Sequence, residues 1–82
     1  MAEVNYRGYL NTLTKKRSEA VDADSIKDLL NYIERNYGKD IKKYSKSMLI
    51  TVDGISIGFQ SRYATPLTKS SVVSFLPVAG GG

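Results

Sequence analysis

Apolar residues recur at helical spacing in one stretch of this chain, residues 25–37. The apolar stripe consists of Ile26, Leu29, Leu30, Ile33 and Tyr37, at positions i, i+3, i+4, i+7 and i+11. Asp24 or Ser25 is placed to cap the helix start, Asp28 completes a pattern that resembles a capping box, and Gly38 follows the last turn. The pattern predicts one amphipathic helix of about 20 Å, which needs an apolar surface to lie on.

Strand-like segments flank this helix on both sides. Alternating or continuous apolar residues predict strands at residues 3–6, 18–21, 48–52, 55–57 and 72–76. Residues 9–13 carry apolar side chains at helical spacing and predict a short helical turn. The polar, lysine-rich residues 38–47 are interpreted as a crossover loop, and Asp53 with Gly54 as a tight turn.

The order of these segments predicts the fold class. It is α+β, with a mixed β-sheet packed on one main α-helix, because a helix with one apolar stripe needs one sheet face to cover it. The last strand is expected to be central or near-central, since its apolar residues Val72, Val73, Phe75 and Leu76 are available to both faces of a sheet. A length of 82 residues predicts a single domain, residues 1–76, followed by a flexible tail, residues 77–82.

The expected tail has a composition of its own. Pro77 ends the last strand because it has no N–H group for a sheet hydrogen bond. The residues that follow are small, Val78, Ala79, Gly80, Gly81 and Gly82, and the segment from Pro77 reaches roughly 20 Å when fully extended. Such a thin thread can enter a narrow site on a partner, because glycine has no Cβ. The alternative is a frayed terminus without a function.

Composition excludes several kinds of site. The chain has no Cys and no His, which excludes a thiol nucleophile, Cys/His zinc sites and the commonest general base. Its eight carboxylates form no paired motif, so no independent active site and no metal site are expected. No apolar run is long enough to span a membrane and the first residues include charged ones, which predicts a cytoplasmic protein.

The net charge of +4 comes with two basic clusters, residues 15–17 and residues 39–46. Such clusters can bind nucleic acid, but solvated turns are the more common explanation. The segments also lack an aromatic-rich recognition motif, so no nucleic-acid partner is predicted.

Several motifs lie in or before the last strand and at the end of the chain. They are Thr65-Pro66-Leu67-Thr68, Val73, Phe75-Leu76-Pro77 and Gly81-Gly82. In these motifs, and over its whole length, the chain resembles the ubiquitin-like sulfur-carrier family of the MoaD and ThiS type, most closely the small subunit of molybdopterin synthase. The resemblance implies a ubiquitin-like β-grasp fold.

The resemblance also implies a carrier whose chemistry takes place on its own C-terminus, as a non-catalytic subunit. An E1-like adenylating enzyme would use ATP and magnesium to adenylate the carboxylate of Gly82, beside its thin neighbour Gly81. A sulfur donor would then supply a thiocarboxylate, which donates sulfur to the pterin dithiolene of the molybdenum cofactor in the large synthase subunit. Implied partner contacts are Phe75, Leu76, Pro77, Val78, Ala79 and Gly80. The chain itself would bind no cofactor, nucleic acid or membrane.

The chain departs from the family pattern at three places, and alternatives stay open. Val78 follows Pro77 where the family usually has a second proline, three glycines end the chain, and residues 69–71 replace an acidic turn. Counting from Thr65 without gaps favours Gly82 as the reactive residue, and a gapped alignment favours Gly81. Other functions are a sulfur carrier for thiazole, cysteine or tungsten-pterin pathways, a ubiquitin-like protein modifier, or a small basic binding domain.

Overall fold

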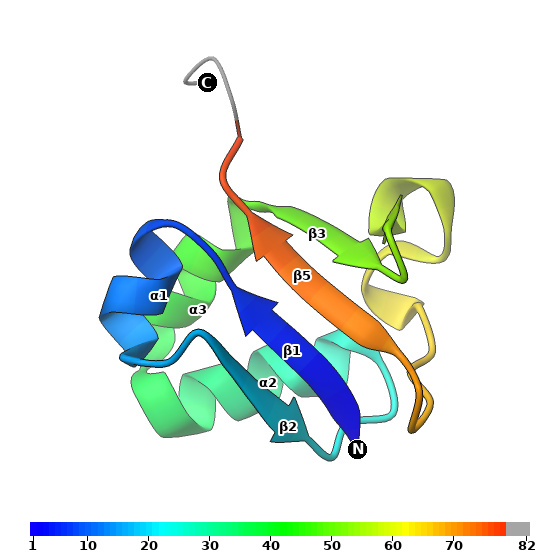
Figure 1. Cartoon of the computed structure of the whole chain (residues 1–82), viewed down its shortest axis with the longest axis horizontal. Coiled ribbons are helices and arrows are strands. Elements are labelled where there is room, and N and C mark those ends of the chain that lie inside the picture. The colour runs from blue at the N-terminus through cyan, green and yellow to red at the C-terminus, as the bar shows by residue number, and fades with distance from the viewer. Residues whose placement is uncertain (79–82) are drawn as a thin grey trace.

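A five-stranded mixed sheet organises the computed structural model, which describes residues 1–78 (Figure 1). The strand order is β2-β1-β5-β3-β4. The strands are β1 (Ala2–Tyr6), β2 (Ser18–Val21), β3 (Leu49–Val52), β4 (Ile55–Ser56) and β5 (Val72–Leu76). β5 runs parallel to β1 and antiparallel to β3, so its backbone is paired on both sides. The predicted central place of the last strand is confirmed.

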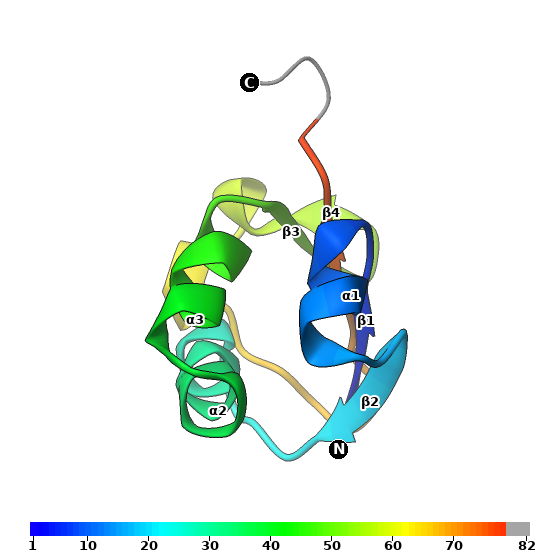
Figure 2. The same ribbon diagram turned by 90° about the vertical axis from the view of Figure 1, so that its left-hand side faces the viewer.

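Helices cover one face of this sheet. They are α1 (Tyr9–Thr14), α2 (Ile26–Tyr37) and α3 (Lys39–Lys46), with 3-10 turns η1 (Ile57–Phe59) and η2 (Arg62–Ala64). Figures 1 and 2 show α2 and α3 together on one side of the sheet, while no described helix lies over the opposite face. Within the described part of the chain, no helix has the length and apolar character to cross a bilayer.

The predicted amphipathic helix is confirmed as α2. The side chain of Ser25 accepts a hydrogen bond from the Asp28 backbone N–H at 3.2 Å, which caps the first turn. Its apolar stripe forms the core with the inner sheet face, through the buried residues Ile26, Leu29, Leu30, Ile33, Val4, Tyr6, Ile50, Val52, Val73 and Phe75. Gly38 has a φ of 104°, which lets the chain turn directly from α2 into α3.

The interpretation of residues 38–47 as a crossover loop is wrong, because Lys39–Lys46 form α3. Ile41 and Tyr44 pack against the core, and Ser45 is fully buried and donates a hydrogen bond to the Ile41 carbonyl at 2.8 Å. Half of the helix is lysine, so its apolar face is only one or two residues wide. Packing against α2 therefore stabilises α3 more than the sequence pattern of α3 itself does.

The last strand carries apolar side chains on both of its faces, as predicted, but the helices cover only one of these faces. Val73 and Phe75 are fully buried under the helices, but Val72 is 36% exposed and Leu76 is only half-buried. The strand is central because its backbone pairs with β1 and β3, although one of its side-chain faces is open. This leaves apolar side chains on the uncovered face of the sheet.

A carboxylate inside the domain joins β2 to β1 and α2. Glu19 pairs with Val4 in the ladder between β1 and β2 and points to the core side, where its side chain is 10% exposed. Its oxygens accept hydrogen bonds from Tyr6 at 2.6 Å, Tyr37 at 2.7 Å, Tyr32 at 2.8 Å and Lys16 at 3.2 Å. Burial opposes ionisation, but these hydrogen bonds outweigh it and lower the pKa of Glu19 below its ordinary 4.5.

We expect Glu19→Gln to lower the free energy of unfolding at pH 7 by about 1–3 kcal/mol, because several hydroxyls lose a charged acceptor. The lowered pKa means that this stabilisation is present above pH 4.5 and is lost as the pH falls. The free energy of unfolding of the variant should therefore fall less steeply than that of the parent as the pH is lowered. Urea unfolding between pH 3 and pH 7 measures both effects.

The matched control for this prediction is Glu34→Gln. It removes the same charge from a half-exposed carboxylate that pairs with Lys42 alone, at 2.9 Å. Its cost should be clearly smaller than that of Glu19→Gln, because an exposed ion pair contributes little to stability. Equal losses in the two variants would contradict the structural role given to Glu19.

Candidate functional site

The candidate site lies where the chain leaves the sheet after β5. Leu76 is the last strand residue, and Pro77 and Val78 follow it outside any helix or strand, both exposed. Figures 1 and 2 show this part of the chain continuing from the end of the central strand β5, away from the helices. Because β5 is paired on both sides, the point of exit is held by a strand that two neighbours fix in place.

Gly8 fixes the direction in which the chain leaves. It follows β1 with a φ of 63° and a ψ of −141°, a conformation that is essentially restricted to glycine. A Cβ at this position would lie 2.9 Å from Cγ of Pro77. The Arg7 backbone N–H also donates to the Phe75 carbonyl at 3.2 Å, which continues the ladder between β1 and β5 up to this contact. The bare glycine therefore makes room for the proline ring.

We expect Gly8→Ala to lower the free energy of unfolding by about 1–3 kcal/mol, through backbone strain and the contact with Pro77. Gly54→Ala is the matched control, since Gly54 also has a positive φ, 84°, but an added Cβ there meets nothing within 4 Å. Chemical denaturation should show the larger loss for Gly8, and amide chemical shifts should move at Val78 only in that variant. Equal losses would contradict the bracing contact.

An apolar surface adjoins the exit. Leu49 on β3 pairs with Leu76 on β5, and Leu49 is 41% exposed. Val78, two residues beyond Leu76, is 55% exposed. We call Leu49, Leu76, Pro77 and Val78 the exit patch. Exposed apolar side chains grouped in this way are typical of a surface that a partner covers.

The structure places the predicted site residues in three groups. Leu76, Pro77 and Val78 lie at the surface, where a partner can contact them. Phe75 is fully buried and its ring stacks on Tyr6 with 6.0 Å between ring centres, so the prediction of a direct partner contact by its side chain is corrected to a core position. Ala79, Gly80, Gly81 and Gly82 lie outside the described residues.

Two residues of this surface were not predicted from the sequence. The sequence predicts a strand that ends before Gly8 and a strand at residues 48–52 that includes Leu49, but it assigns neither residue to a functional surface. The alternation of Met48, Ile50 and Val52 does place Leu49 on the outer face. No signal in the sequence pairs Gly8 with Pro77, because their contact depends on the register between β1 and β5.

The described residues carry little catalytic chemistry. In residues 1–78, no group of three or more His, Cys, Asp or Glu side chains is placed to hold a metal ion. The surface around the exit is apolar and lacks a titratable side chain in the exit patch itself. The arrangement is therefore suited to present a chain segment to another protein.

The chain was compared with known families and proteins. The model of the ThiS family matches residues 4–82. Among curated protein sequences, none matches the chain.

Solved structures with the same architecture include small archaeal modifier protein 1 (SAMP1) from Methanosarcina acetivorans. It is 20% identical, with a TM-score of 0.81 over 99% of this chain and 95% of that one. A chain of the Amycolatopsis orientalis BexX/CysO complex is 14% identical, with a TM-score of 0.80 and full coverage of both chains, 100% each. A Pyrococcus furiosus protein, provisionally assigned as molybdopterin converting factor subunit 1, is 19% identical, with a TM-score of 0.61 over 94% of this chain and 97% of that one.

At these identities the likeness shows the fold. The α+β arrangement, a mixed sheet with its main helix on one face, is a ubiquitin-like β-grasp, as the sequence predicted.

Proposed function

Because this chain belongs to the ThiS family and is a ubiquitin-like sulfur carrier or modifier, we propose that it serves as the small subunit of molybdopterin synthase. In this proposal the carboxylate of Gly82 is converted to a thiocarboxylate, and Gly81 keeps the chain beside it thin. The sulfur is then donated in the formation of the pterin dithiolene of the molybdenum cofactor.

One observation carries the proposal: the chain leaves the domain from the central strand, at a point braced by Gly8 and Pro77. The segment that follows is small in every side chain after Val78. A carrier needs this combination, because its reactive end must enter a partner's site while the domain stays at a fixed distance. The family match includes these last residues, since it extends to Gly82.

The proposed chemistry needs an activated carboxylate. A C-terminal carboxyl group has a pKa near 3.5, so it is ionised at neutral pH and is a poor electrophile. Its oxygen would attack the α-phosphate of ATP on an E1-like adenylating enzyme, with magnesium there, and pyrophosphate would leave. A sulfur nucleophile from a donor would then attack the carbonyl carbon, and AMP would leave. The products are the thiocarboxylate and AMP.

The exit patch supplies a docking surface for these partners. Leu49 and Val78 are apolar and exposed, and the half-buried Leu76 lies between them along the chain and the ladder, so one surface can serve the adenylating enzyme and the large synthase subunit in turn. The BexX/CysO complex contains a chain of this fold together with a partner protein. The name of the Pyrococcus furiosus protein supports the assignment to molybdopterin synthesis.

The test is an intact-mass spectrum after incubation with ATP, magnesium, an E1-like activating enzyme and a sulfide source. We expect a gain equal to the exchange of one oxygen for one sulfur, located at Gly82 by fragmentation and absent when ATP is omitted. Transfer of that sulfur to a pterin precursor in the presence of the large synthase subunit tests the pathway.

An unmodified mass with several activating enzymes would contradict the sulfur-carrier proposal. A ubiquitin-like modifier, the function that the name of SAMP1 gives to that neighbour, predicts a different product. It would form an amide with a lysine of another protein, seen as a conjugate of higher mass.

A further inference from the structure

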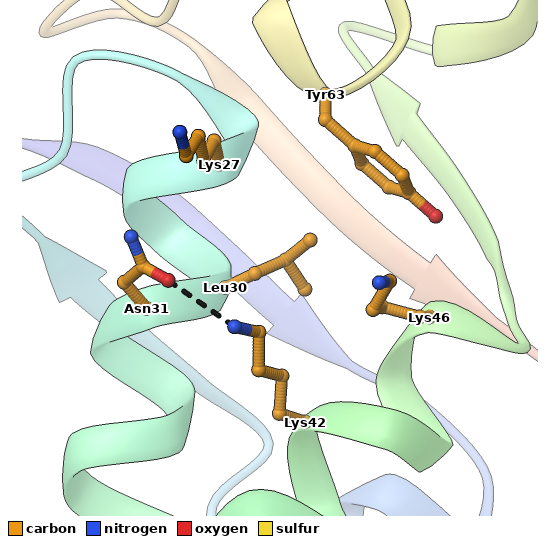
Figure 3. Close-up of a pocket in the computed structure, with 6 residues that line it drawn as sticks. All are labelled: Lys27, Leu30, Asn31, Lys42, Lys46 and Tyr63. Carbon is orange, nitrogen blue, oxygen red and sulfur yellow. Dashed lines mark hydrogen bonds between the residues drawn. The ribbon is translucent and has the colours of Figure 1, made fainter.

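A hollow on the helical side of the domain has a cationic rim and an apolar floor. Its volume is about 220 Å³, and it lies between α2, α3 and η2 (Figure 3). The lining residues are Lys27, Leu30, Asn31, Lys42, Lys46 and Tyr63. In Figure 3 the side chains of Leu30 and Tyr63 face the hollow from two sides, and the three lysines surround it. No residue of the exit patch lines this first hollow, whereas Leu49 lines the neighbouring hollow described below.

The three lysines differ in the partners they already have. Lys42 is held by Glu34 at 2.9 Å and by Asn31 at 3.2 Å, so its charge is largely compensated. The ammonium group of Lys46 lies 5.3 Å from the ring centre of Tyr63, a cation–π contact. Among residues 1–78, neither Lys27 nor Lys46 forms an ion pair with a carboxylate. Two ammonium groups at the rim are therefore available to an anionic ligand.

A second hollow adjoins the first. It measures about 170 Å³ and shares Lys46 and Tyr63 with the first, while Met48 and Ile57 contribute apolar walls and Arg62 adds a cation. Arg62 has a φ of 53°, and Thr65 holds this turn by donating a hydrogen bond from its hydroxyl to the Arg62 carbonyl at 2.6 Å. The hydrogen bond from Thr65 therefore holds Arg62, a charged surface residue, in a backbone conformation that is unfavourable for a residue other than glycine.

The volume of each hollow limits the kind of ligand that it can hold. Sites for whole small molecules commonly measure about 300–1,000 Å³, so each hollow here is suited to one side chain. Two neighbouring apolar hollows with cations between and around them match an extended peptide in which apolar and acidic side chains alternate. Charge complementarity of this kind favours an acidic protein partner.

Nucleic acid fits the same surface less well. Single strands are bound by several stacked aromatic rings and a continuous row of cations. Among the described residues, Tyr63 is the one aromatic side chain that lines either hollow. We propose that the surface formed by Lys27, Lys46, Arg62 and Tyr63 over these two hollows binds an acidic, apolar peptide segment of a partner protein.

The experiment is a titration of the full ¹⁵N-labelled chain with the peptide acetyl-Asp-Phe-Glu-Leu-Asp-amide at low salt. We expect saturable chemical-shift changes at the amides of residues 30, 31, 46 and 63. The amide analogue acetyl-Asn-Phe-Gln-Leu-Asn-amide should bind at least about fivefold more weakly, because it lacks the charges.

Two double variants distinguish binding at this surface from a general effect of the protein's net charge. Lys27→Gln with Lys46→Gln should weaken binding about five- to tenfold. Lys39→Gln with Lys43→Gln removes the same charge from lysines that line neither hollow, and should leave the affinity unchanged. Melting temperatures confirm that both variants are folded. The readout needs no sulfur chemistry, so it is independent of the proposed carrier function.

Three results would overturn the proposal. One is the absence of saturable shifts at these amides, and another is an equal loss of affinity in the two double variants. The third is tighter binding of inorganic phosphate or of an oligothymidylate with the same shift pattern, which would assign the surface to phosphate groups.

Discussion

Deletion of Gly81 and Gly82 should abolish sulfur loading completely and leave the melting temperature unchanged. The reason for the loss is chemical, because the proposed acyl adenylate forms on the terminal glycine carboxylate and the new end, Gly80, is two residues nearer the domain. The reason for the unchanged stability is structural. Among residues 1–78, the last member of the core along the chain is Phe75. Intact mass after reaction and thermal unfolding measure the two effects separately.

A single deletion makes this prediction sharper. Because residues 80–82 are all glycine, removing any one of them gives the same chain, in which two glycines follow Ala79. If that shorter chain loads sulfur as well as the parent, two glycines after Ala79 are sufficient, as in the gapped alignment. If loading falls, the full reach of the tail is required, as in the ungapped count. A chain without Gly81 and Gly82 that keeps its biological function would contradict the carrier proposal and favour a binding domain.

The elements that the sequence predicted well are those with a strong local pattern. α2 has four buried residues at helical spacing and a serine cap, and both features act within the helix itself. The turn at Asp53 and Gly54 also depends on local chemistry, since both residues have a positive φ there. Such features are visible in a sequence because each is decided by neighbours along the chain.

The elements that the sequence did not predict depend on contacts between distant segments. α3 is stabilised by packing of Ile41 and Tyr44 on other elements, and its lysines conceal this narrow face. Glu19 was interpreted as an ordinary strand residue, yet three tyrosines from β1 and α2 surround it. Their positions follow from the strand register and the helix orientation, which a single sequence does not encode locally.

At the candidate site, too, the sequence predicts the local features but not those that depend on contacts between distant segments. The run from Phe75 to Gly82 predicts a functional end of the chain, but its sequence does not separate core residues from surface residues. In β5 the burial alternates, so Phe75 is buried and its neighbour Leu76 is half-exposed. A position before the tail is therefore not by itself evidence of a partner contact. The structure assigns opposite roles to two adjacent apolar residues.

These opposite roles predict opposite effects of substitution. Phe75→Ala should lower the free energy of unfolding by about 3–5 kcal/mol, because it removes a fully buried ring from the central strand. The loss includes the stacking on Tyr6, whose hydroxyl is in turn bound by Glu19. A domain of this kind has about 5–15 kcal/mol in total, so a large part of its stability would be lost. The shift of the urea midpoint measures the effect.

Leu76→Ala is the matched control, one residue further along the same strand. It should cost less than about 1.5 kcal/mol, since its side chain is only half-buried, but it should weaken complex formation with the adenylating enzyme. Phe75→Leu keeps most of the buried volume and remains measurable if the alanine variant does not fold, with an expected cost of about 1–1.5 kcal/mol. If Phe75→Ala instead leaves the midpoint unchanged and weakens the complex, the ring is a surface contact. Phe75 and Leu76 would then have to exchange faces, which requires a one-residue shift of β5 against β1 and β3 and would invalidate the register on which the exit patch rests.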